Sequence, residues 1–238
     1  MNWTVSSHNR DQCQIKGQPD GKCHNFVRVF HGPLPVPYYH HYNVKKKDED
    51  APEEEGETAG DEGDKAQENN DDGFILCGTN AFKPTCRYYD ADLKNHTAEF
   101  SGVGYSPFDP AHSSTSVLHD GAVYAGTVAD FGGTDALIYR SPLRTEQNDL
   151  KHLNSPKFVS SLSHGDFAYF FFREFAIEHS NCGKAIFSRV ARICRHDRGS
   201  RKHKDRFTTF LKARLNCSVP GEFPFYFDHI SKSAHNNN

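Results

Sequence analysis

The sequence has no long hydrophobic run, since no window approaches about 18 consecutive apolar residues. A helix that spans a bilayer needs roughly 20 predominantly apolar residues, so a transmembrane helix is excluded. Residues 1–8 contain neither a basic stretch nor an apolar core. A secretory signal peptide at the start of the chain is therefore excluded as well.

Motifs of several enzyme and metal-binding classes are also missing. No Cys-x-x-Cys pair is present, and adjacent histidines such as His40 and His41 lack helical spacing, which argues against a zinc site. No Gly-x-Ser-x-Gly nucleophile motif occurs. Asp130, Asp135 and Glu174 are the candidates for the paired carboxylates of a glycosidase. Asp is favoured in glycine-rich turns for its local hydrogen bonds, and Glu174 fits a structural ion pair. We therefore expect no catalysis, no metal and no cofactor.

Basic residues are not concentrated as nucleic-acid binding would require. Residues 45–72 contain 13 Asp or Glu and 4 Lys, and the rest of the chain contains 24 basic and 18 acidic residues. The net charge of −3 therefore averages two different regions. The basic residues are dispersed apart from one loop, so we expect no nucleic acid as a partner. Residues 43–72 are too polar to offset the entropy of ordering, which predicts a disordered acidic insertion.

Seven cysteines are present, an odd number, and they lie at positions 13, 23, 77, 86, 182, 194 and 217. A glycine- and proline-containing loop separates Cys13 from Cys23, and we favour a disulfide there over two free thiols. The pair Cys77 and Cys86 is compatible with either a disulfide or a metal site. Three N-glycosylation sequons begin at Asn2, Asn95 and Asn216. Both patterns favour an oxidising, extracellular location, and without an export signal we expect the chain to be incomplete.

Residues 158–177 have the pattern of a β-hairpin. Two runs rich in aromatic and β-branched residues flank the turn-forming residues 163–166. The second run, residues 167–172, is almost continuously apolar, so we expect that strand to be buried on both faces. A strand covered on both faces must lie within a stack of sheets.

A second hairpin turn is predicted at Asp120-Gly121, about 45 residues before the first. This spacing indicates a weak repeat of about 45 residues. The strands around Asp120-Gly121 match those around Gly165-Asp166, and residues 185–194 with 208–217 begin a third pattern. Several short strands in each repeat are typical of propeller blades. A β-sandwich is the competing class, but it needs only about 100 residues and has no such period. We therefore predict an all-β propeller.

The densest basic region lies between residues 189 and 206. Arg198, Arg201, Lys202 and Lys204 are candidates for contact with an acidic partner surface or a sulfated glycan, where charge mostly raises the association rate. The alternative is a solvated loop between strands, because long loops are polar in any case.

Seven stretches, in order along the chain, resemble the sema domain of semaphorins. One is Cys77-Gly78-Thr79-Asn80-Ala81-Phe82-Lys83-Pro84-Thr85-Cys86. The others are residues 23–29, 124–131, 143–147, 169–174, 188–194 and 208–221. The pattern is most similar to that of transmembrane invertebrate semaphorins. Phe207 departs from it, because the family usually has Trp there.

The resemblance implies a seven-bladed β-propeller of which residues 1–238 form a partial sema domain of about three blades. It also implies disulfides Cys13–Cys23 and Cys77–Cys86. Partners of Cys194 and Cys217 would lie further downstream, and Cys182 is left over, so all three are expected to be unpaired here.

In function, the resemblance implies an extracellular or cell-surface guidance cue that binds a plexin receptor and repels growing axons or migrating cells. The full-length form would be membrane-anchored and would dimerise. The alternative is a truncated, non-signalling fragment, because three blades cannot close a ring and would leave strand edges unpaired.

Overall fold

The computed structural model describes residues 3–33, 72–94, 96–181 and 183–231. Strands dominate this part of the chain, and their order follows the sequence within each sheet. The bounds of the strands in the three four-stranded sheets are β1 Val27–Pro33, β2 Asp72–Gly78, β3 Thr85–Tyr89 and β4 His96–Ser101; β5 Thr115–His119, β6 Ala122–Val128, β7 Ala136–Arg140 and β8 Leu143–Arg144; β9 Lys157–His164, β10 Phe167–Phe175, β11 Ile186–Cys194 and β12 Leu211–Arg214.

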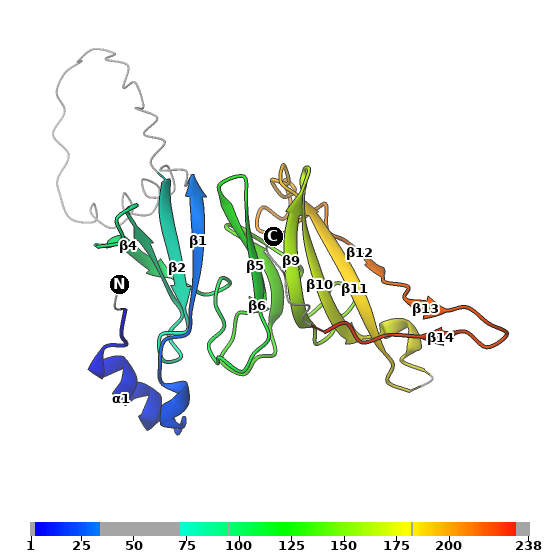
Figure 1. Cartoon of the computed structure of the whole chain (residues 1–238), viewed down its shortest axis with the longest axis horizontal. Helices are drawn as coiled ribbons and strands as arrows, with labels where there is room; N and C mark the ends of the chain where they lie inside the picture. Colours follow the sequence, from blue (N-terminus) through cyan, green and yellow to red (C-terminus); the bar gives the residue numbers. More distant parts are fainter. Residues whose placement is uncertain (1–2, 34–71, 95, 182, 232–238) are drawn as a thin grey trace, which may run out of the picture.

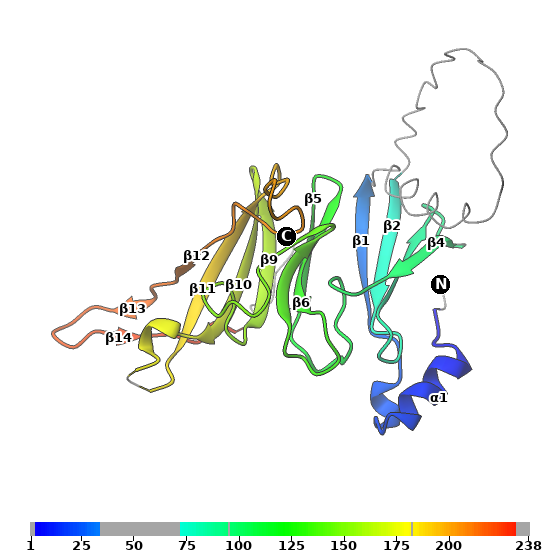
Figure 2. The ribbon, with the colours of Figure 1, turned by 180° about the vertical axis from the view of Figure 1, so that it is seen from behind.

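Each four-stranded sheet is an antiparallel meander, and the three sheets lie side by side as blades (Figure 1). We call them blades 1, 2 and 3, in chain order. Their first strands, β1, β5 and β9, are neighbours, because β5 contacts both β1 and β9. This arrangement confirms the prediction of an all-β, propeller-like fold of about three blades. The described sheets do not close into a ring (Figure 2).

Both predicted hairpins are present. His119 pairs with Ala122 around Asp120-Gly121, and His164 pairs with Phe167 around Gly165-Asp166. Asp120 and Gly121 have φ of 50° and 70°, the left-handed conformation that a two-residue hairpin turn requires. Each turn joins the first and second strands of its blade, which explains the repeat of about 45 residues between them. The prediction that residues 185–194 with 208–217 begin a third pattern is wrong, because they form β11 and β12 of the same sheet as β9 and β10.

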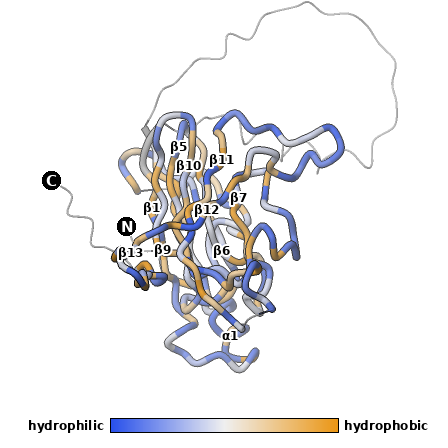
Figure 3. The backbone as a smooth tube through the Cα atoms, turned by 90° about the vertical axis from the view of Figure 1, so that its right-hand side faces the viewer, coloured by the Kyte–Doolittle hydropathy of each residue, from blue (hydrophilic) through white to orange (hydrophobic). Residues whose placement is uncertain are grey.

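The prediction that β10 is buried on both faces is wrong for one face. Exposure alternates along the strand: Phe170 and Phe172 are fully buried, whereas Tyr169 and Phe171 are half-buried. The buried side chains point toward blade 2, and no sheet among the described residues covers the opposite face. Hydrophobic residues otherwise follow the strands, and the connecting loops are more hydrophilic (Figure 3).

The main hydrophobic core lies between blades 2 and 3. Tyr124 and Ile138 of blade 2 pack with Phe158, Phe170 and Phe172 of blade 3. Close approach of the two sheets needs a residue without a side chain at Gly126, because a Cβ there would lie 2.6 Å from the Phe158 ring. A smaller core between blades 1 and 2 includes Phe30, Ile75 and Val123.

The amino-terminal region contains a helix that the strand patterns did not predict. Helix α1, Ser7–Ile15, begins after Ser6, whose hydroxyl accepts a hydrogen bond from the Asn9 N–H at 3.2 Å. A serine at this position is a usual start signal of a helix. Cys13 is the buried residue of α1, and it is joined to Cys23 just after a 3-10 turn, Asp20–Lys22.

The Cys77–Cys86 disulfide links the adjacent strands β2 and β3. Between them the backbone makes an unusual turn in which Asn80, Ala81 and Phe82 all have positive φ. Such a conformation costs free energy in residues other than glycine and needs support from its surroundings. The Asn25 side chain provides part of that support, since its oxygen accepts a hydrogen bond from the Asn80 N–H at 3.0 Å.

Most of the predicted acidic insertion, residues 43–71, lies outside the described residues. The prediction is wrong at its last position, because Asp72 begins β2 and pairs with Pro33 of β1. The backbone pairing between β1 and β2 extends past the point where the composition becomes polar. The hydrogen bonds between paired strands involve only the backbone and do not depend on side-chain polarity. The start of β2 therefore cannot be predicted accurately from amino-acid composition alone.

We predict that Phe172→Ala destabilises the protein by about 3–5 kcal/mol, because it removes a fully buried ring and leaves a cavity between blades 2 and 3. The measurement is urea unfolding followed by circular dichroism. Phe223→Ala is the matched control, since that ring is 89% exposed and its loss should change the free energy of unfolding by less than about 0.5 kcal/mol. Equal effects of the two substitutions would contradict this account of the core.

Candidate functional site

The loop from Arg195 to Arg206, which joins β11 to β12, is the candidate functional site, and we call it the basic loop. It lies at the same end of the blades as the β5–β6 and β9–β10 turns, opposite α1 (Figure 1). We call this end the upper rim.

A buried carboxylate organises the basic loop. Asp197 is 3% exposed and accepts hydrogen bonds from the backbone N–H groups of Gly199, Thr208 and Thr209 at 2.7–2.9 Å. The hydroxyl groups of both threonines also donate to it, at 3.0 and 2.7 Å. Burial alone would raise the pKa of Asp197, but these hydrogen bonds to the charged form outweigh it and hold the pKa below its ordinary value. The carboxylate thus fixes both ends of the loop.

Blade 2 holds the basic loop from the other side. The Arg140 guanidinium, at the end of β7, donates hydrogen bonds to the backbone carbonyls of Arg195, at 2.6 Å, and of Asp197. It also donates to the Tyr124 hydroxyl at 3.1 Å. The backbone of Arg144 exchanges hydrogen bonds with that of Asp205 and Phe207 at 2.9 and 3.0 Å. The loop is therefore a fixed part of two blades.

Some cations of the basic loop are already neutralised. Arg195 pairs with Asp120 at 3.4 Å and with Asp166 at 3.0 Å, the two acidic residues of the neighbouring hairpin turns. Arg206 pairs with Glu146 at 3.3 Å. These pairs tie the loop to the upper rim and contribute little positive charge to its surface.

The four predicted contact residues are different. Arg198, Arg201, Lys202 and Lys204 are all exposed, and none of them forms an ion pair with another described residue. The structure thus brings four free positive charges together on a loop whose backbone is fixed. An anionic surface could approach them without displacing an internal partner. Their role in contact with a partner stays a prediction.

The acidic residues considered for catalysis have structural partners. Asp135 is bound by the Arg144 guanidinium at 2.5 and 3.1 Å, and Glu174 by Arg189 at 3.0 Å. Asp130 accepts hydrogen bonds from its own turn, including the Asp135 N–H at 2.7 Å. Asp130 and Asp135 lie in one turn of blade 2, whereas Glu174 lies on β10 of blade 3.

Glu174 belongs to a buried charge cluster that the sequence only partly predicted. Arg189 bridges Glu174 and Glu178, and Lys212 also pairs with Glu174. Burial lowers the pKa of Lys212, although the hydrogen bond from its amino group to Glu174 opposes this change. The cluster joins β10, β11 and β12 and explains why Arg189 and Lys212 interrupt apolar strands. No group of three or more His, Cys, Asp or Glu that could hold a metal is found in the described ranges.

The predicted cysteine and glycosylation sites divide between described and undescribed residues. The structure joins Cys13 to Cys23 and Cys77 to Cys86, the pairs that the resemblance implies. Cys194, half-buried, and Cys217, exposed, form no disulfide with another described residue. Asn216 is exposed. The remaining predicted positions, Cys182, Asn2 and Asn95, lie outside the described residues.

Sequence reasoning did not identify the two residues that fix the loop. Asp197 had a local signal, because the Asp-x-Gly pattern at 197–199 is typical of a turn in which the side chain accepts from the residue two positions on. Arg140 had none, since its loop partners are about 55 residues away in the sequence. In the described part of the chain, no helix has the length and apolar character needed to cross a membrane.

Comparison with known proteins identifies close relatives. Semaphorin-1A of Schistocerca americana is 44% identical over 237 residues, which are 98% of this chain and 28% of that protein. The structure of Drosophila Semaphorin 1b, extracellular domains 1-2, matches with a TM-score of 0.76 and 42% identity, over 96% of this chain and 38% of that one. The chain in the structure of Drosophila Plexin A in complex with Semaphorin 1b matches with a TM-score of 0.77 and 41% identity, over 98% of this chain and 38% of that one.

The chain spans less than a third of the length of the curated relative. No family model matches it.

We predict that Asp197→Asn lowers the free energy of unfolding at pH 7 by about 1–3 kcal/mol, because it weakens five hydrogen bonds to a buried carboxylate. A lowered pKa in the folded state means that the carboxylate stabilises the fold above its unfolded pKa of about 3.9. That contribution is lost as the pH falls through the folded pKa.

The measurement is urea unfolding at pH 7 and at pH 3, together with hydrogen exchange of residues 198–206. The difference between the two proteins should shrink at pH 3, and exchange in the loop should accelerate in the variant. Asp205→Asn, at an exposed position of the same loop, is the control. A variant as stable as the unmodified protein at pH 7 would show that Asp197 does not fix the loop.

Proposed function

Because the chain belongs to the semaphorin family, we propose that it is part of an extracellular ligand that binds a plexin receptor through its upper rim. The observation that carries the proposal is the cluster of four unpaired cations on the basic loop, on a backbone fixed by Asp197 and Arg140. A relative of 41% identity is present in a structure with Drosophila Plexin A, which supports the choice of partner.

The mechanism is binding without catalysis. A preorganised loop loses little conformational freedom on binding, so less of the interaction energy is spent on ordering it. Its unpaired charges attract an acidic receptor surface and raise the association rate, an effect that salt screens. A sulfated glycan is a second anionic partner of the same chemistry.

The biological role that follows is guidance. The full-length ligand would signal to axons or migrating cells as a repellent, with dimerisation allowing one ligand to bring two receptors together. Two disulfides and an exposed sequon at Asn216 support an extracellular or cell-surface location.

A second candidate function is a product that does not signal by itself. Apolar side chains around the hairpin β13–β14, Ser218–Val219 and Phe225–Tyr226, support it. Phe223 is 89% exposed and Phe225 64% exposed, in a region where no described sheet covers blade 3. Exposed aromatic clusters of this kind promote self-association.

We predict that replacing Arg198, Arg201, Lys202 and Lys204 together by Gln lowers the rate of association with a plexin ectodomain about tenfold at low salt. The dissociation rate should change little, since exposed charges contribute mainly to the encounter. Surface plasmon resonance at two salt concentrations measures both rates. Lys16, Lys83, Lys151 and Lys157, four exposed lysines outside the loop, are replaced by Gln in the control.

Two outcomes separate the parts of this proposal. If the unmodified chain binds plexin and the loop variant matches the control, the upper rim is the wrong surface. If the chain does not bind plexin and light scattering shows aggregates, the non-signalling candidate is favoured instead.

We further predict that Asn216 carries an N-linked glycan when the chain is secreted behind a signal peptide from a eukaryotic cell. Its exposure leaves the amide nitrogen accessible to the transferase. Glycopeptide mass spectrometry, before and after enzymatic deglycosylation, checks the site, and Asn216→Gln should lose the signal. Asn148, which is not in a sequon, serves as the unmodified control position. An unoccupied Asn216 in secreted protein would contradict the prediction.

A further inference from the structure

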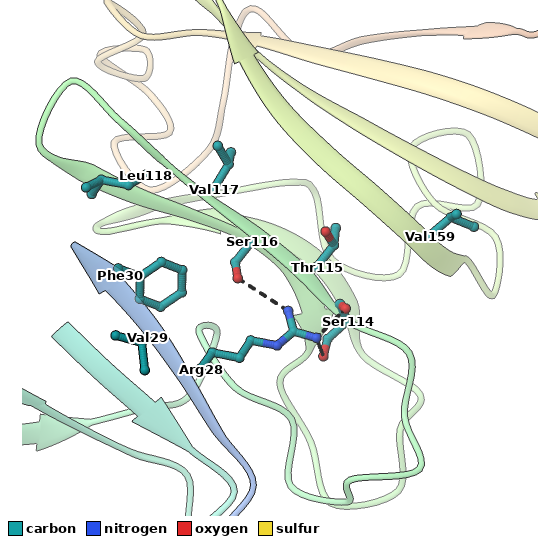
Figure 4. A pocket seen from close by; sticks show the side chains of 9 residues that line it. All are labelled: Arg28, Val29, Phe30, Ser114, Thr115, Ser116, Val117, Leu118 and Val159. Carbon is teal, nitrogen blue, oxygen red and sulfur yellow. Dashed lines mark hydrogen bonds between the residues drawn. The ribbon is translucent and has the colours of Figure 1, made fainter. Parts of the chain in front are cut away.

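A groove of about 470 Å³ runs along the first strands of the three blades, and none of its lining residues belongs to the basic loop. Residues 28–30 of β1 and residues 114–118 at β5 line it, together with Val159 of β9 (Figure 4). Its volume lies within the range of small-molecule sites.

The groove contains a positive charge without a counter-ion. The Arg28 guanidinium reaches from blade 1 to blade 2, where it donates to the Ser116 hydroxyl at 3.3 Å, to the Ser114 hydroxyl at 2.8 Å and to the Ser114 carbonyl. These acceptors are neutral, and Arg28 forms no ion pair with a described residue. By contrast, Arg87, Arg144 and Arg189 each contact a carboxylate.

The bonding of Arg28 leaves capacity for a ligand. A guanidinium has five N–H donors, and three are used here, by Nη1 once and Nη2 twice. The Nε–H and one Nη1–H have no acceptor among the described residues. Arg28 is half-buried, and burial lowers its pKa, although a guanidinium stays charged at neutral pH. An uncompensated, partly desolvated charge is costly, so an anion placed beside it would be stabilised.

Another part of the groove is apolar. Phe30 and Leu118 line it and pack in the core between blades 1 and 2, whereas Val117 packs against the core between blades 2 and 3. The site therefore has a cationic, hydroxyl-rich end and a hydrocarbon end. A single positive charge matches a monoanion, whereas a phosphate dianion would leave one charge uncompensated.

We propose that this groove binds a small organic acid, with its carboxylate at Arg28 and Ser116 and its hydrocarbon part against Phe30 and Leu118. None of its residues belongs to the basic loop, and the proposed site does not depend on contact with a receptor.

The experiment is isothermal titration of the full chain with octanoate, with its neutral analogue octanamide and with inorganic sulfate. Arg28→Gln should weaken octanoate binding at least tenfold. Arg87→Gln is the matched control on the same blade, since Arg87 pairs with Glu99 and lies outside the groove. Octanamide should bind at least tenfold more weakly than octanoate, and sulfate should show no binding.

Several results would overturn the proposal. They are absence of octanoate binding by the unmodified chain, equal binding by the Arg28→Gln variant, and equal binding of octanamide. Sulfate binding as tight as that of octanoate would show a simple anion site and overturn the organic-acid assignment. If circular dichroism shows that Arg28→Gln is unfolded, Ser116→Ala replaces it. That variant removes one hydroxyl and should weaken octanoate binding about threefold, and unchanged binding would overturn the proposal.

Discussion

Aromatic packing between neighbouring sheets is the interaction on which the rest of this structure depends. A single four-stranded sheet has two faces and cannot bury either one alone. Blades 2 and 3 each bury one face against the other, and Phe158, Phe170 and Phe172 pack against Tyr124 there. The absence of a side chain at Gly126 brings the sheets close enough for that contact. Everything at the rim is placed by this packing, because both hairpin turns extend from strands that it holds.

Charged side chains then hold the basic loop and join the strands of blade 3, in addition to the hydrophobic contacts. Asp197 gathers the two ends of the basic loop, and Arg140 fastens its carbonyls to the adjacent blade. Inside blade 3, Glu174, Arg189 and Lys212 join three strands through buried ion pairs. Each of these charges has at least one hydrogen-bond partner, which is the condition under which a buried charge can stabilise a fold. Among the cations that form no ion pair with a described residue are the four on the surface of the basic loop and Arg28 in the groove.

These two places differ in what they can recognise. The basic loop presents several exposed charges on a fixed backbone, which suits a large anionic surface and fast encounter. The groove presents one half-buried charge among serine hydroxyls, with apolar side chains nearby, which suits a small ligand with a single acidic group.

Local chemistry was enough to predict the hairpins, the strand repeat and the exposed basic loop. Asp120-Gly121 and Gly165-Asp166 specify turns by their own backbone preferences, and alternating apolar residues specify the strands between them. Helix α1 was missed because its polar sequence carries only a weak start signal at Ser6. The half-buried face of β10 was also missed, since an apolar run does not say which neighbours will cover it.

Only the tertiary structure decided which charges are paired. Arg28 meets Ser114 across 86 positions of sequence, and Arg140 meets Asp197 across 57. Such contacts depend on how one blade lies against the next. The sequence by itself therefore determined the strands and turns of each blade, because these follow from neighbouring residues. The packing of the blades determined the rim and the groove, because burial and pairing of a charge depend on residues brought near only by folding.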